Sequence, residues 1–128
     1  MTEYLDVQDV LAIAKVVLEP FGMEVKIRDY GLLQSAVARP QAGGFGIEAY
    51  PDLFEKAAAL LHSLASNHSL IDGNKRTAWT VTAVFVDIND HELLEPLNED
   101  AAEELVLEVA QSRLDVPEIA RRLRPFFS

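Results

Sequence analysis

Two strongly apolar segments joined by one short polar loop constrain the fold of this chain more than any other feature. The first follows Asp52, a residue type that caps helices, and is apolar on almost every side from Leu53 to Ala65. The second begins near Asn74 and is similarly apolar as far as Ile88. Helices that are apolar on most sides are buried, so we expect both segments to lie at the centre of the fold.

Four more segments have the three- and four-residue hydrophobic spacing of helices that pack by one face. They are expected at residues 7–18 and 30–38, after the helix-capping Asn98, and from Asp115 onward. Residues 23–29 alternate weakly and fit a short extended piece. The predicted fold class is therefore all-α, a compact bundle of about six helices.

Residues 40–51 interrupt this helical pattern. They are too rich in glycine for a helix and too apolar for an inert linker, so we expect a short β-like flap, with a plain connecting loop as the alternative. Exposed aromatic residues on a mobile segment often contact a binding partner. The candidate partner-binding residues of this flap are Gly43, Gly44, Phe45, Gly46, Ile47 and Tyr50.

Length and composition exclude several classes of protein. Residues 1–128 have the length of a single domain, and the absence of cysteine excludes disulfides, thiolate catalysis and cysteine-bound metals. The 11 Lys and Arg against 21 Asp and Glu give a net charge of −10, which argues against direct nucleic-acid binding. No signal peptide and no membrane-spanning apolar run is found, so we expect a cytoplasmic protein without a membrane partner.

The polar loop between the two apolar segments carries the candidate chemistry. Five polar side chains fall within nine residues, namely His68, Asp72, Asn74, Lys75 and Arg76. Polar groups beside a core are costly unless they are paired or bind a ligand. A structural interpretation makes them helix caps and partners of the acidic surface, whereas a functional interpretation makes them a binding site.

The functional interpretation depends on where the second apolar helix begins. If it begins around Gly73, its first N–H groups lack partners within the helix and form an anion site, to which Lys75 and Arg76 add positive charge. A carboxylate at Asp72 would be repelled by phosphates unless Mg²⁺ bridged them. His68 is suited to deprotonate an attacking hydroxyl. These residues together predict a site for a polyphosphate.

The acidic residues are concentrated elsewhere in the sequence. Nine of the 21 lie between Thr77 and Ser112, where no Lys or Arg occurs. The simplest interpretation is a solvated acidic face. We expect this face to occupy a different surface from Lys75 and Arg76, so that only Asp72 opposes their charge.

The loop residues resemble the signature of the Fic/Doc family, His-x-Phe-x-(Asp/Glu)-(Gly/Ala)-Asn-(Gly/Lys)-Arg. The family's Fic branch transfers AMP from ATP to protein hydroxyls. The resemblance implies the family's helical fold, His68 as the catalytic base and Asp72 as the ligand of Mg²⁺. It also implies that ATP is bound through its phosphates by Gly73, Asn74, Lys75 and Arg76.

Two departures from the Fic pattern are typical of the family's Doc branch, the toxins of Phd–Doc toxin–antitoxin systems. Lys75 stands where Fic enzymes have a second glycine, and Trp79 stands where they have a second arginine that holds the distal phosphates. Leu70 replaces the usual Phe, which is a conservative change. Resemblance to the Doc branch implies a reversed nucleotide, so that the γ-phosphate of ATP is transferred to a threonine of translation elongation factor Tu and protein synthesis stops.

The same resemblance implies two protein partners. One is a Phd-like antitoxin whose disordered C-terminal segment folds on the toxin, and the other is elongation factor Tu, positioned as substrate by the flap. Two other hypotheses stay open. In the first, the chain is a Fic-type AMP transferase that acts on protein hydroxyls. In the second, it is a catalytically silent module that binds a partner.

Overall fold

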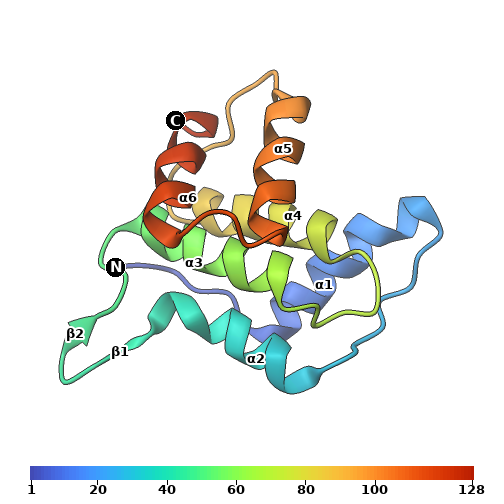
Figure 1. The fold of residues 1–128 in the computed structure, drawn as a ribbon, viewed down its shortest axis with the longest axis horizontal. Coiled ribbons are helices and arrows are strands. Elements are labelled where there is room, and N and C mark those ends of the chain that lie inside the picture. The colour runs from blue at the N-terminus through green and yellow to red at the C-terminus, as the bar shows by residue number, and fades with distance from the viewer.

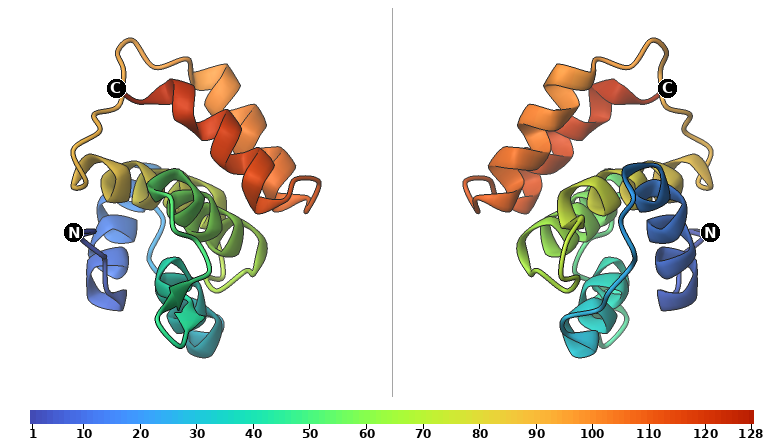
Figure 2. Two further views of the ribbon diagram at one scale, coloured as in Figure 1. Left: turned by 90° about the vertical axis from the view of Figure 1, so that its left-hand side faces the viewer. Right: turned by 90° about the vertical axis from the view of Figure 1, so that its right-hand side faces the viewer.

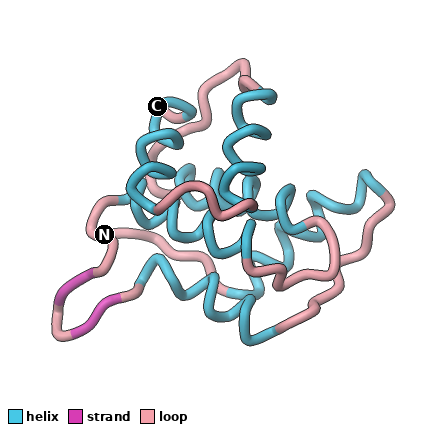
Figure 3. The backbone as a smooth tube through the Cα atoms, viewed as in Figure 1, coloured by secondary structure: helices cyan, strands magenta, loops and turns pink.

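The computed structural model of the chain describes residues 1–128 and confirms the all-α prediction (Figure 1). Six α-helices are joined by turns and loops and by one two-stranded antiparallel hairpin, whose strands Figure 3 shows in magenta. The bounds are α1 (Val7–Leu18), α2 (Tyr30–Ala38), β1 (Gly43–Gly44), β2 (Ile47–Glu48), α3 (Leu53–Ser66), α4 (Asn74–Asp87), α5 (Glu99–Ala110) and α6 (Val116–Leu123).

The helices form three layers, as the side views in Figure 2 show. The two apolar helices, α3 and α4, pack against each other in the middle layer. The α5 and α6 pair covers one side of this layer, and α1 and α2 lie on the other side. The prediction that α3 and α4 are central is therefore confirmed.

Helix α3 is buried on nearly all sides, and four of its nine buried residues are alanines. Ala57, Ala58 and Ala59 are each 0% exposed, and they allow neighbouring helices to approach closely. Larger residues such as Leu61 and Phe85 of α4 fill the space between the layers within one core cluster. The spacing of apolar residues predicted this core because a helix can bury its hydrophobic face only against another element.

The α-helices of this chain are capped by side chains at their starts, with one exception. Asp6, Asp29, Asp52, Asn98 and Asp115 each accept a hydrogen bond from a main-chain N–H in the first turn of α1, α2, α3, α5 and α6. Helix α4 begins after Gly73 and has no side-chain cap. Its first N–H groups are therefore left for another partner.

The predicted flap is a hairpin anchored to α3 by a buried lysine. Gly43 pairs with Glu48 and Gly44 with Ile47 in antiparallel register. The Lys56 ammonium donates to Glu48 Oε1 at 2.9 Å and to the main-chain carbonyl of Tyr50, and Lys56 is only 1% exposed. The apolar residues around Lys56 predicted a buried face of α3. They did not indicate that the lysine itself would be buried there.

None of the helices combines the length and the hydrophobicity that crossing a membrane requires.

Replacing Glu48 tests the anchor. The variant Glu48→Ala would leave the Lys56 ammonium with one protein hydrogen-bond partner in a buried position, so we expect the free energy of unfolding to fall by about 1–3 kcal/mol. Urea denaturation measures this loss. Glu24→Ala is the matched control, because Glu24 and Lys26 form an exposed pair at 4.0 Å and should contribute less than about 0.5 kcal/mol. Equal losses in the two variants would contradict the anchor.

Candidate active site

The loop between α3 and α4 is fixed in place by the extended segment of residues 26–29. The main-chain N–H groups of Arg28 and Asp29 donate to the carbonyl of Ser69 at 2.8 and 3.1 Å. The N–H of Ile71 donates in turn to the carbonyl of Lys26 at 2.8 Å. The weak alternation at residues 23–29 predicted an extended piece, and the structure shows that this piece supports the loop.

Gly73 turns the chain from the loop into α4 and requires glycine for two reasons. Its φ is +79°, which side chains disfavour, and a Cβ at this position would lie 2.5 Å from Cδ2 of Leu18. The N–H of Gly73 donates to Oδ1 of the preceding Asp72 at 2.8 Å, and Asp72 is exposed. The positive φ and the close approach of Leu18 therefore both favour glycine at the residue that precedes α4.

The side chain of Asn74 locks the loop. Its Nδ2 donates to the carbonyl of Leu70 at 2.9 Å, and its Oδ1 accepts from the N–H of Leu70 at 3.0 Å. Both polar ends of the amide are thus used within the protein. A phosphate contact from Asn74 would have to come from its main-chain N–H at the start of α4.

Lys75 and Arg76 are exposed at the uncapped start of α4. The Arg76 guanidinium lies over the ring of Phe21, 3.9 Å from the ring centroid, in the 3₁₀ turn that follows α1. This cation–π contact holds the arginine beside the loop. Sequence reasoning missed Phe21, since nothing local relates a residue after the first helix to the motif.

His68 is exposed and has a positive φ of +53°, which is uncommon for a residue other than glycine. Its carbonyl accepts a hydrogen bond from Nε of Arg28 at 2.6 Å. The main chain at His68 is thus fixed while its ring faces solvent. Of the motif residues, the structure brings His68, Asp72, Lys75 and Arg76 onto one loop and the first turn of one helix.

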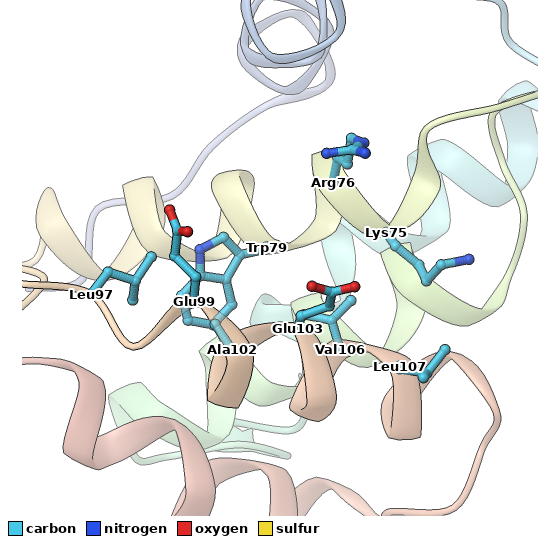
Figure 4. Close-up of a pocket in the computed structure, with 9 residues that line it drawn as sticks. All are labelled: Lys75, Arg76, Trp79, Leu97, Glu99, Ala102, Glu103, Val106 and Leu107. Carbon is cyan, nitrogen blue, oxygen red and sulfur yellow. The ribbon is translucent and has the colours of Figure 1, made fainter. Parts of the chain in front are cut away.

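A pocket of about 390 Å³ opens beside Lys75 and Arg76 between α4 and α5 (Figure 4). Its walls are mostly apolar, and two carboxylates stand at its edge on α5. The lining residues are Lys75, Arg76, Trp79, Leu97, Glu99, Ala102, Glu103, Val106 and Leu107.

The expectation that the acidic face and the cations occupy different surfaces is wrong at this pocket. Glu99 and Glu103 line the same pocket as Lys75 and Arg76. The reason is the packing of α5 against α4, which brings residues more than twenty positions apart face to face. Sequence separation alone could not have indicated this approach.

The hairpin lies at the opposite end of α3 from the loop (Figure 1). Phe45 and Ile47 at its tip are 107% and 74% exposed, so the prediction of an exposed apolar flap is confirmed. Tyr50 differs, because it is half-buried at the base and its hydroxyl accepts from Nε of Arg39 at 3.1 Å. The structure therefore does not bring the flap residues together with His68.

No group of three or more His, Asp or Glu side chains is arranged to hold a metal ion. Asp72 is the carboxylate of the loop, and its Oδ1 already accepts from Gly73. Its second oxygen is a hard donor of the kind that Mg²⁺ prefers, and Mg²⁺ in nucleotide sites takes one or two carboxylates together with substrate phosphates. The residues present fit that mode of binding.

Comparisons with known proteins identify a family and a relative of this chain. A family model described as "Fic/DOC family" matches residues 4–86, from the N-terminal segment through most of α4. A protein named "Toxin Doc" from Mycolicibacterium smegmatis is 53% identical over 126 residues, which cover 98% of this chain and 95% of that protein.

Gly73→Ala tests whether the turn into α4 needs glycine. The added Cβ would meet the Leu18 side chain, and the alanine would have to adopt a disfavoured positive φ. We therefore expect a loss of about 1–2 kcal/mol in the free energy of unfolding. Chemical denaturation measures it. Gly44→Ala serves as control, because nothing lies within 4 Å of its added Cβ. A loss no larger than that of the control would show that the turn tolerates a side chain.

The pH dependence of stability reports on His62 of α3. Its Nδ1 lies 2.7 Å from Nη1 of Arg39, and partial burial together with that guanidinium lowers the pKa of His62 below its ordinary 6.5. The unfolded chain therefore takes up this proton at higher pH than the folded protein does. We expect the free energy of unfolding to fall as the pH drops from about 6.5 until it passes the lowered pKa.

The variant His62→Asn keeps an acceptor for Arg39 without a titrating ring, so this part of the pH dependence should disappear. Denaturation midpoints measured between pH 7 and pH 5 check the prediction. An unchanged slope in the variant would assign the effect to other groups.

Proposed function

The chain belongs to the Fic/DOC family, and from this premise we propose that it is a toxin kinase, which transfers the γ-phosphate of ATP to a threonine of elongation factor Tu and arrests protein synthesis. The likeness to a protein named "Toxin Doc" at 53% identity supports the toxin class. Such an enzyme would act in the cytoplasm, where its substrate is found.

One observation carries the proposal of phosphate transfer. Helix α4 alone starts without a side-chain cap, and Lys75 and Arg76 stand exposed in its first turn. Free N–H groups, the positive end of the helix dipole and two cations together favour a polyphosphate. Lys75 occupies the position of a Fic glycine, which favours the Doc arrangement of the nucleotide over AMP transfer.

The pocket between α4 and α5 supports a place for the nucleoside. Its apolar wall includes the Trp79 indole, on which a base can stack, and it opens directly beside Lys75. Glu99 and Glu103 at its edge would repel phosphates. A nucleotide bound with its base in the pocket and its phosphates toward the loop satisfies both conditions.

His68 is proposed as the general base. An imidazole nitrogen of His68 accepts the proton of the threonine hydroxyl, and the hydroxyl oxygen attacks the γ-phosphorus. The bond between that phosphorus and the oxygen bridging to the β-phosphate breaks, and ADP leaves. The exposed position of His68 allows a protein hydroxyl to reach it.

Asp72 is proposed to hold the Mg²⁺ that accompanies ATP, through the carboxylate oxygen that does not accept from Gly73. Bound there, the ion neutralises phosphate charge that would otherwise be repelled by the carboxylate. Arg76, held over Phe21, and the free N–H groups of α4 orient the phosphates.

The flap is proposed to position the protein substrate. Phe45 and Ile47 are exposed at its tip, and β1 and β2 leave free edges to which an extended segment can pair. The flap and His68 lie at opposite ends of α3, so a substrate that contacts both must be large, as a protein is.

The remaining partner is proposed to be a Phd-like antitoxin. Its disordered C-terminal segment would fold on this chain, which has no inhibitory Ser/Thr-x-x-x-Glu-Gly/Asn helix of its own. Growth arrest that persists when the cognate antitoxin is co-expressed would contradict this arrangement.

Doubly labelled ATP tests the reaction. Incubation with elongation factor Tu and Mg²⁺ should transfer label from the γ-phosphate and none from the α-phosphate, with a mass gain of one phosphate on a threonine. Label from the α-phosphate would overturn the kinase proposal in favour of AMP transfer.

Variants test the assigned residues. His68→Ala should abolish transfer and toxicity, and toxicity that survives would favour a silent binding module. Lys75→Ala should raise the KM for ATP by about tenfold or more, since it removes a charged phosphate contact. Lys26→Ala, which removes an exposed lysine outside the loop, should leave KM unchanged.

A further inference from the structure

We propose that Arg28 is a positioning residue that fixes the direction of His68, an inference that rests on the proposed function of that histidine. Arg28 lies 40 positions before His68, in the extended segment that supports the loop. It does not line the pocket, and its side-chain hydrogen bonds go to main-chain carbonyls, so the geometry gives it an effect on His68 through the main chain.

The side chain of Arg28 spans two successive carbonyls. Its Nε donates to the carbonyl of His68 at 2.6 Å and its Nη2 donates to the carbonyl of Asn67 at 3.2 Å. Asn67 is the C-cap of α3, where main-chain carbonyls have no partner within the helix and the dipole is negative. A guanidinium is well suited to this position because its donors form a rigid fork.

These two hydrogen bonds hold the carbonyls on both sides of the His68 Cα, where the main chain has its uncommon conformation. His68 has a φ of +53°, and a return to negative φ would rotate its peptide planes and move its carbonyl. Contacts on the far side of His68 are also fixed, because the carbonyl of Ser69 accepts from the N–H groups of Arg28 and Asp29. Arg28 thus holds the one residue of the loop whose main chain would otherwise relax, and with it the direction of the imidazole.

Arg28 is exposed and lies outside the core cluster, so its removal should leave the fold intact. This separates a positioning role from a structural one. Asn67 remains held by its own side chain in the absence of Arg28. Its Nδ2 donates to the carbonyl of Leu32 at 3.0 Å, and its Oδ1 accepts from the N–H of Ser69 at 3.1 Å. The freedom gained on removing Arg28 should therefore be local to His68.

The experiment compares Arg28→Ala and Arg28→Lys with Lys26→Ala, an exposed cation of the same segment that pairs only with Glu24. With elongation factor Tu and Mg-ATP, Arg28→Ala should lower kcat on the order of 100-fold while the KM for ATP changes less than about twofold. Arg28→Lys can replace one of the two hydrogen bonds and should recover part of kcat. Lys26→Ala should match the wild type.

A second measurement does not depend on activity. Hydrogen exchange followed by NMR should show faster exchange at the N–H groups of residues 69–71 in Arg28→Ala, with unchanged protection in the core helices and an unchanged melting temperature. An unaltered loop, or a uniform loss of protection and melting temperature, would overturn the positioning role. If the wild type transfers no phosphate, the proposed function fails, whereas the exchange result still decides whether Arg28 orders His68.

Discussion

The antiparallel packing of α3 against α4 is the interaction on which the rest of the structure depends. It buries the apolar surface of both helices and brings the C-terminal end of α3 and the N-terminal end of α4 to one short loop. Partial charges of opposite sign therefore meet there. The Arg28 guanidinium donates a hydrogen bond at the negative, C-terminal end of α3, whereas the positive, N-terminal end of α4 has no side-chain partner. The C-terminal end of α3 therefore has a cationic partner within the chain, and the N-terminal end of α4 is open to an anion.

The distribution of charge follows from this packing. Although the net charge of the chain is −10, Lys75 and Arg76 lie together at the uncapped start of α4. The packing of α5 places Glu99 and Glu103 at the neighbouring pocket. Repulsion from these carboxylates limits where a polyphosphate can lie. The acidic composition, which argues against nucleic-acid binding, would thus help to orient the nucleotide of the proposed reaction.

The fold was predictable where its causes are local. Helical periodicity and the capping residues Asp52 and Asn98 marked the helices, and the motif marked the loop with His68 and Asp72. What the sequence could not supply depends on contacts between distant segments. Four contacts arise only when distant segments come together in the fold: the hydrogen bonds of Arg28, the stacking of Arg76 on Phe21, the burial of Lys56, and the presence of Glu103 and Lys75 at one pocket.

The anchoring of the hairpin through Lys56 has a consequence for selectivity. The flap is bonded to the first turns of α3, and the loop with His68 follows its last turn, so a rigid rod of 14 residues, roughly 21 Å long, separates the two. If a protein substrate pairs with the flap, as proposed above, it can present to His68 only a residue that lies at a matching distance on its own surface. Under the proposed function, the length of α3 would select one hydroxyl among many by its distance from the segment that binds the flap, with little need to recognise its neighbours in sequence.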